Sequence, residues 1–236
     1  MFAITDCRIS AEAVSALEEY GFESILLRPA DYLSPSVASH TDMLLFMGLG
    51  RIFCHRRYFE SNSALIDRIA ALSGLELTLS DEPTGEKYPL DVLFNACLVG
   101  KSLICNEKTV SKLILEAARD RGCEIIGVPQ GYTKCSVTVV SDNAVITADK
   151  AIAAACRGAG IDVLEISEGH ISLPPYDFGF IGGASGACGD NVYFCGSLDS
   201  HPDGEMIKAF CEKHKKAAIS LTGGQLQDTG SLFFII

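Results

Sequence analysis

One order of segments occurs four times along the chain: a short apolar strand, a tight turn, a second strand, an amphipathic helix and a third strand. The four copies span residues 42–80, 91–129, 134–167 and 177–222. The helices end at Gly74, Gly122 and Gly160, residues typical of a helix C-terminus, and at Lys215 in the last copy. The pattern predicts repeated units with the same supersecondary structure.

The two ends of the chain supply a fifth copy. Residues 1–29 read as a second strand, a helix and a third strand, and residues 228–236 (DTGSLFFII) read as the missing first strand. Pairing of the first and last segments closes the ring and leaves no open edge. We therefore expect an α/β fold of five pseudo-repeats in a single domain, residues 1–236.

Five strand–strand–helix–strand units with mixed termini resemble the pentein superfamily. This superfamily includes arginine and agmatine deiminases, amidinotransferases, dimethylarginine hydrolases and a ribosome-binding translation initiation factor. The run GFIGGASG at residues 179–186 is similar to a bacterial group within it to which no activity is assigned. The resemblance covers essentially the whole chain and implies a five-bladed α/β propeller whose first strands line a central channel.

Charge and hydropathy exclude several classes of partner. The chain has 19 Lys and Arg against 30 Asp and Glu, a formal charge of −11, and no basic cluster that could follow a phosphate backbone or an anionic membrane. No segment approaches the ~20 apolar residues of a membrane span, and residues 1–10 lack a basic stretch followed by an apolar run. We expect a cytoplasmic protein that binds neither nucleic acid nor membrane; the oligomeric state is not predicted.

The ten cysteines are predicted to be reduced and mostly structural. The chain has no C-x-x-C motif and no paired Cys and His spacing of the zinc type, so we expect no metal ion and no cofactor. Cys54, Cys105 and Cys195 occupy the second-strand position that Thr5 and Thr147 take in the other units. That equivalence predicts a small buried side chain at this position.

One position carries a charged residue in every unit. Where each first strand is predicted to start, the five units have Asp42, Asp91, Lys134, Asp177 and Asp228. Aspartate is also common at such positions because its side chain accepts hydrogen bonds from the local backbone. If the first strands line a channel, however, these groups converge near one mouth, where neighbouring carboxylates raise one another's pKa or require a cation. The pattern predicts a site for a positively charged group.

Strand alternation predicts the neighbours of this ring. Residues two apart share a face, which places Asn95 with the aspartates. The opposite face includes Met43, Phe178 and Phe180, which should pack against the helices, and strict alternation puts Cys135 on that side as well.

The loops before the first strands add Tyr132 as a pocket wall and His170 as a general acid or base, although His170 can equally be an exposed loop residue. The glycine run 179–186 matches neither a phosphate loop nor a dinucleotide fingerprint. It favours a bulged strand that another part of the backbone approaches closely.

The resemblance also implies where a catalytic pair should be. Enzymes of the superfamily use a Cys nucleophile in the unit formed by the C-terminal segment, a His from another unit, and carboxylates that hold a guanidinium group. The corresponding segment here, residues 227–234, contains no cysteine, and Asp177 stands where the His would be sought. The remaining candidates are Cys135 as nucleophile and His170 as base.

Three functions follow as hypotheses. The favoured one is a non-catalytic or divergent pentein-like protein that binds a small guanidino or amino cation in an Asp-lined channel. In it the positive group is held by Asp91, Asp177 and Asp228, and the rest of the ligand is oriented by Asn95, Tyr132 and His170. The alternatives are a hydrolase or deiminase of a guanidino compound, and a protein that uses one face of the ring for a macromolecular partner.

Overall fold

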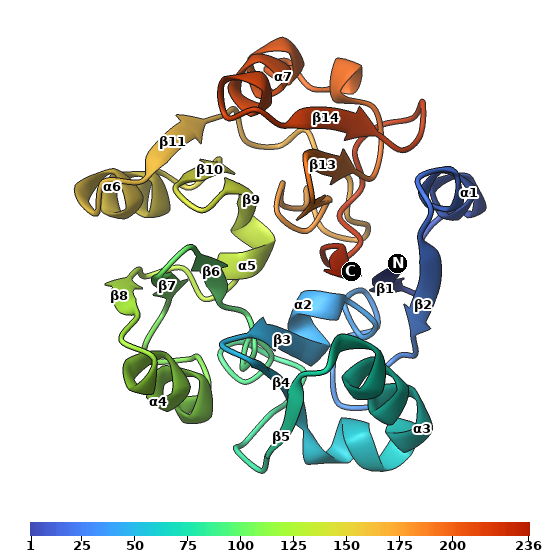
Figure 1. Ribbon diagram of the computed structural model, residues 1–236, viewed down its shortest axis with the longest axis vertical. Helices are drawn as coiled ribbons and strands as arrows, with labels where there is room; N and C mark the ends of the chain where they lie inside the picture. The colour runs from blue at the N-terminus through green and yellow to red at the C-terminus, as the bar shows by residue number, and fades with distance from the viewer.

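The protein contains five separate three-stranded sheets in a computed structural model that describes residues 1–236. Figure 1 shows the sheets arranged around a common centre, with a helix on the outer side of each. In every sheet the middle strand pairs antiparallel with one neighbour and parallel with the other. The α/β fold and the repeated unit are as the sequence predicts, and none of the sheets is closed on itself.

Each unit has the same connection order. The sheets are β15–β1–β2 (Phe233–Ile235, Phe2–Asp6, Glu23–Leu27), β3–β4–β5 (Leu45–Gly48, Arg51–His55, Glu76–Ser80), β6–β7–β8 (Cys97–Val99, Ser102–Cys105, Glu124–Gly127), β9–β10–β11 (Val137–Ser141, Ala144–Thr147, Asp162–Glu165) and β12–β13–β14 (Ser185–Cys188, Asn191–Phe194, Ala217–Ser220). The outer helices join second strands to third strands and are α1 (Ala11–Glu19), α3 (Arg56–Ser73), α4 (Lys112–Asp120), α6 (Lys150–Gly158) and α7 (Gly204–Lys213), the last preceded by a 3-10 turn, η1 (Leu198–Ser200).

The two ends of the chain share one sheet. Strand β15 pairs antiparallel with β1, with Phe2 opposite Ile235 and Ile4 opposite Phe233, and β1 pairs parallel with β2. Figure 1 shows the N- and C-termini beside each other near the centre. The predicted pairing of the terminal segments is therefore confirmed.

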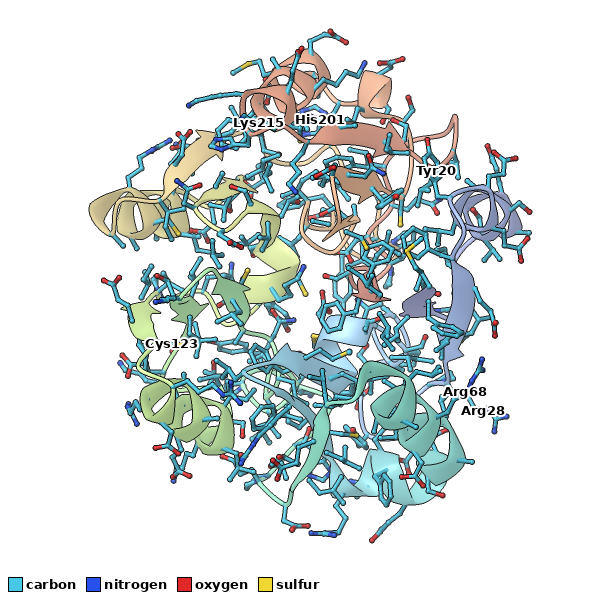
Figure 2. The ribbon with its side chains drawn as sticks, viewed as in Figure 1. Tyr20, Arg28, Arg68, Cys123, His201 and Lys215 are labelled. Atoms are coloured by element: carbon cyan, nitrogen blue, oxygen red, sulfur yellow. The ribbon has the colours of Figure 1, made fainter.

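The helix ends and the repeated cysteines also follow the sequence pattern. Gly74 caps α3 in the left-handed conformation, with φ of 66°, and Lys215 adopts φ of 59° just after α7 (Figure 2). Cys54 and Cys105 are fully buried, and all ten cysteines are free. The apolar face of α3 packs on the middle strand of its sheet, where Ile66 joins Cys54 in the largest core cluster.

The segments before the first strands differ from the prediction. Asp42 lies in a short helix, α2 (Thr41–Leu44), and Lys134 lies in another, α5 (Thr133–Ser136), both next to the centre of the ring (Figure 1). Short apolar runs fit a helical turn as well as a strand. In α2 the backbone N–H groups of Met43 and Leu44 donate to the carbonyl of His40, so the chain enters the sheet from a helical turn. Strand alternation therefore does not hold at these positions.

The glycine run also begins outside the sheet. Gly179 and Gly183 lie in loop and turn conformations, and β12 starts only at Ser185. No helix of the protein has the length and apolar composition needed to cross a bilayer.

Candidate functional site

A cavity of about 200 Å³ lies where α2, α5 and the loops before β6, β12 and β15 meet. We call it the acidic pocket. It is lined by Val37, His40, Met43, Asp91, Tyr132, Cys135, Leu173, Tyr176, Phe178, Phe180 and Asp228. The lining contains two carboxylates and four aromatic rings besides His40, and it contains no Lys or Arg. Its residues come from segments far apart in the sequence, so only the tertiary fold creates it.

Asp228 is held at the inner wall by backbone donors. Its Oδ2 accepts from the N–H of Phe180 at 2.9 Å and its Oδ1 from the N–H of Gly230 at 3.0 Å. A Cβ at Gly179 would overlap the Cβ of Asp228, and one at Gly183 would overlap its carboxylate. The backbone approach expected of the glycine run occurs at Gly182, in a turn and not in a bulged strand. Burial raises the pKa of Asp228, and the negative charge of Asp42 raises it further.

Asp91 is the second carboxylate that lines the acidic pocket. The hydroxyl of Tyr132 donates to its Oδ2 at 2.6 Å, whereas its Oδ1 is buried without a hydrogen-bond partner. Burial raises the pKa of Asp91. Burial and this hydrogen bond also raise the pKa of Tyr132, so its hydroxyl stays a donor. Asp91 Oδ1 is therefore a buried acceptor that no group of the protein satisfies.

His40 stands between two carboxylates. Its Nδ1 is 3.8 Å from Asp228 Oδ1 and its Nε2 is 3.7 Å from Asp6 Oδ2. Arg8 is bonded to the same Asp6 carboxylate, with Nε 3.0 Å from Oδ1, and also donates to the carbonyl of Ser36 at 2.8 Å. Burial opposes ionisation of Asp6, but the hydrogen bonds from Arg8 lower its pKa. The Arg8 charge therefore offsets that of Asp6, and no guanidinium or ammonium group lines the acidic pocket.

Cys135 is buried in the largest core cluster and also lines the acidic pocket. Asn95 holds it from two directions, because Nδ2 donates to the thiol sulfur at 3.0 Å and Oδ1 accepts from the Cys135 N–H at 3.2 Å. Burial raises the pKa of the thiol well above its usual value, and the nearby carboxylates of Asp42 and Asp228 add to the effect. The side chain of Cys135 is therefore a neutral thiol.

Asp42 is buried behind the pocket wall. Its Oδ2 accepts from the Ser231 hydroxyl at 2.6 Å, and its Oδ1 has no partner. Asn95 is equally buried and binds the Asp42 carbonyl as well as Cys135, so it fixes the walls and does not reach the cavity.

The structure separates the remaining predicted residues from this site. Asp177 is exposed and lines no part of the pocket, because the loop before β12 turns its carboxylate to solvent. His170 is also exposed, and its ring packs against His201 at a centroid distance of 5.3 Å. Lys134 lines a different cavity, of about 230 Å³. Of the five predicted ring residues, Asp91 and Asp228 line the pocket and Asp42 lies behind it.

Several lining residues were not expected from the sequence. Met43, Phe178 and Phe180, predicted to face the helices, line the pocket because their segments are helical turn and loop. The rings of Tyr132 and Phe180 stack with centroids 6.1 Å apart. His40 was missed as well; the only signal for it is a histidine two residues before a ring aspartate.

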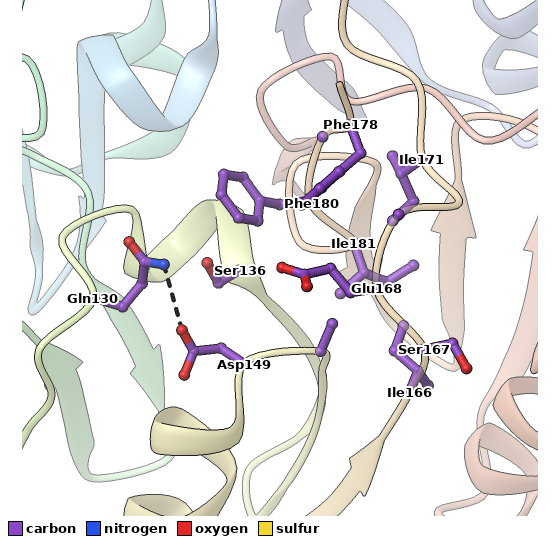
Figure 3. A pocket seen from close by; sticks show the side chains of 13 residues that line it. Gln130, Ser136, Asp149, Ile166, Ser167, Glu168, Ile171, Phe178, Phe180 and Ile181 are labelled. Carbon is purple, nitrogen blue, oxygen red and sulfur yellow. Dashed lines mark hydrogen bonds between the residues drawn. The ribbon is translucent and has the colours of Figure 1, made fainter. Parts of the chain in front are cut away.

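A smaller cavity shares part of the aromatic wall. Figure 3 shows Phe178 and Phe180 above it, and Gln130 donating to Asp149 on its other side, at 3.3 Å. Its volume is about 50 Å³, close to the space of one or two water molecules. It is too small for an organic ligand. No group of three or more His, Cys, Asp or Glu side chains in the chain is arranged to hold a metal ion.

Comparison with solved structures finds likenesses over nearly the whole chain. DDAH from Pseudomonas aeruginosa, in a cysteine mutant complexed with citrulline, matches with a TM-score of 0.57 and 10% identity, covering 97% of this chain and 92% of that one. An agmatine deiminase from C. jejuni with substrate bound matches with a TM-score of 0.53 and 9% identity, covering 97% and 91%. An amidinotransferase of the saxitoxin biosynthetic pathway from Microseira wollei matches with a TM-score of 0.59 and 10% identity, covering 95% and 78%.

Sequence comparison is less informative about activity. A model described as "Family of unknown function (DUF6873)" matches residues 4–233. A search of curated proteins found no match.

Proposed function

We propose that this chain, which belongs to the family of unknown function DUF6873 and has the fold of the pentein superfamily, binds a small organic cation of the guanidino or amino class in the acidic pocket. In this proposal residues 1–236 act as one domain, a five-bladed propeller whose pre-strand segments together build the site. The observation that carries it is a cavity with two carboxylates and four aromatic rings but no Lys or Arg.

The electrostatics favour a cationic ligand over a neutral one. Burial raises the pKa of both Asp91 and Asp228, which means that the hydrogen bonds they accept do not fully offset the loss of hydration of their ionised forms. A guanidinium or ammonium group supplies donors for the free Asp91 Oδ1 and a positive charge for both acids. Burying a carboxylate is unfavourable unless such a partner is present.

The aromatic walls support the same ligand class. Tyr132 and Phe180 stack, while Tyr176 is half exposed at the rim. Faces of aromatic rings attract organic cations and also cover the apolar part of such ligands. The volume of about 200 Å³ suits a small molecule. The named structural neighbours include one complexed with citrulline and one agmatine deiminase with substrate bound, which agrees with this ligand class.

Calorimetric titration with agmatine, arginine and putrescine tests the proposal directly. We expect at least one of them to bind, and we expect both Asp91→Asn and Asp228→Asn to weaken that binding at least about tenfold, because each removes a charge-assisted contact. Protein at a ligand concentration of about 100 Kd should be stabilised by about 2.7 kcal/mol.

Asp177→Asn is the matched control, since Asp177 occupies the equivalent position of its unit but is exposed. It should bind like the wild type. Binding that is equally strong in Asp91→Asn, Asp228→Asn and Asp177→Asn would contradict the proposed site, as would the absence of binding by guanidino and amino compounds up to millimolar concentrations.

A hydrolase or deiminase is the second candidate, because Cys135 and His40 line the same pocket as the two carboxylates. Burial is the main cause of the raised pKa of the thiol, and the charges of Asp42 and Asp228 add to it; a bound cation would offset those charges. The thiolate could then form a C–S bond to the guanidino carbon and expel ammonia or an amine, which takes up the thiol proton, and water would release the product and restore the thiol. Release of ammonia or amine from arginine or agmatine that is lost in Cys135→Ser would support this function; release that persists would exclude Cys135 as nucleophile.

A further inference from the structure

A second cavity, of about 230 Å³, lies among the five first strands. Each of the five first strands contributes an apolar side chain to it. These are Met47 of β3, Leu98 of β6, Val139 of β9, Ala187 of β12 and Phe233 of β15. All five are at least partly accessible to solvent. We call this cavity the apolar mouth; it shares no lining residue with the acidic pocket.

Lys134 is the only charged residue that lines the apolar mouth. Its ammonium group donates to the Ser231 hydroxyl at 2.9 Å and, more weakly, to the Gly182 carbonyl at 3.4 Å. Both partners are neutral. The carboxylate of Asp42 accepts from the Ser231 hydroxyl and makes no hydrogen bond with the ammonium group itself. An ammonium group has three N–H donors, so one remains for a ligand.

The position of Lys134 is specified by the fold. Its backbone N–H donates to Asn95 Oδ1 at 2.7 Å, which fixes α5, and its ammonium group lies 6.0 Å from the centroid of the Phe233 ring. In the equivalent positions of the other four units the chain has aspartate. Lys134, the one cation among the five equivalent residues, therefore lines a different cavity from Asp91 and Asp228.

We propose that the apolar mouth binds a small organic acid, a ligand with one carboxylate and an apolar body. The carboxylate accepts from Lys134 in a charge-assisted hydrogen bond, and the body lies against Met47, Leu98 and Phe233. A cavity of about 150 Å³ lined by apolar side chains is sufficient to bind benzene, so the apolar mouth accommodates a short alkyl chain or an aromatic ring. This site is independent of the acidic pocket and of its ligand.

Octanoate and its neutral analogue octanamide are the probes for this site. Isothermal titration should show that the wild type binds octanoate more tightly than octanamide. In Lys134→Met, which retains an unbranched side chain but lacks the charge, octanoate affinity should fall at least about tenfold while octanamide affinity stays within about twofold. Lys101→Met, which removes a charge from an exposed turn, should bind both probes like the wild type.

Leu98→Glu provides a second variant in case loss of the Lys134 contacts disturbs folding. A carboxylate at this half-buried position should repel octanoate and reduce its binding at least as strongly. Equal octanoate affinity in Lys134→Met and wild type, or no octanoate binding at millimolar concentrations, overturns the proposal. The proposal is also overturned if the wild type binds no octanoate and forms a dimer that Leu98→Glu dissociates. A second copy of the chain would then occupy the apolar mouth. Asp91→Asn should leave octanoate affinity unchanged, which separates this test from that of the acidic pocket.

Discussion

Replacement of Asp91 by asparagine should stabilise the unliganded protein at neutral pH while it weakens cation binding. Asp91 is 5% exposed, its Oδ1 has no hydrogen-bond partner, and burial raises its pKa. An asparagine keeps an acceptor for the Tyr132 hydroxyl, which donates to Asp91 Oδ2 at 2.6 Å, and removes the buried charge. A residue kept for ligand binding at the expense of stability should behave in this way.

The size of the effect follows from the unpartnered oxygen. Leaving a buried acceptor unsatisfied costs about 1–3 kcal/mol. The asparagine amide also lacks a partner at that position but is uncharged, so we expect a net gain of about 1 kcal/mol in the free energy of unfolding. In a protein of this size such a gain raises Tm by about 2–4 °C.

The stability difference between Asp91→Asn and the wild type should depend on pH. Because the pKa of Asp91 is raised in the folded state, the protonated group favours folding, and this contribution is present below the unfolded pKa of about 3.9 and is lost as pH rises through the folded pKa. The Asp91→Asn variant lacks this dependence. The difference in Tm between variant and wild type should therefore be near zero at low pH and largest near pH 7.

Calorimetric Tm measurements from pH 4 to pH 8 on wild type, Asp91→Asn and the exposed control Asp177→Asn provide the assay. The control should follow the wild type at every pH. The reasoning is refuted if Asp91→Asn is less stable than the wild type at pH 7, or if the difference between them does not vary with pH.

Three further perturbations test individual parts of the site. Tyr132→Phe should destabilise the protein by about 1–3 kcal/mol at pH 7 in urea unfolding, because Asp91 then has no partner, and the loss should shrink when Asp91→Asn is already present. Cys135 should remain unmodified when folded protein is treated with iodoacetamide at pH 8 and analysed by peptide mass spectrometry, since its pKa is well above the usual value; early modification would contradict the neutral thiol. Gly183→Ala should cost about 1–3 kcal/mol because the added methyl group overlaps Asp228, whereas Gly223→Ala, with open space around its Cβ position, should lie within about 0.5 kcal/mol of wild type.

Local signals were sufficient for the architecture. The repeated strand, turn and helix pattern, the glycines that end helices, and the split copy at the two ends each reflect a conformational preference of a short segment. Their agreement across five copies predicted the shared sheet of β1 and β15 and the burial of Cys54 and Cys105. The same pattern predicted that Asp91 and Asp228 lie close together, and both line the acidic pocket.

The composition of the acidic pocket could not be predicted in this way. Alternation assumes a strand at every ring position, but the N–H of Asp42 donates to the carbonyl of Gly230 and the N–H of Lys134 donates to Asn95. These contacts join segments that are distant in the sequence and hold them as helical turns, which rotates Cys135 toward the cavity and Lys134 away from it.

The sequence by itself therefore determined the units, their number and the way in which the ends of the chain meet, since these depend on local propensity and periodicity. Only the tertiary structure decided which charged groups share a cavity. It placed His40 beside Asp228, turned Asp177 to solvent, and formed two separate cavities, one acidic and one apolar with a single lysine. The direction of a side chain at the end of a strand depends on long-range hydrogen bonds, and the sequence of a short segment does not show which distant residues are its partners.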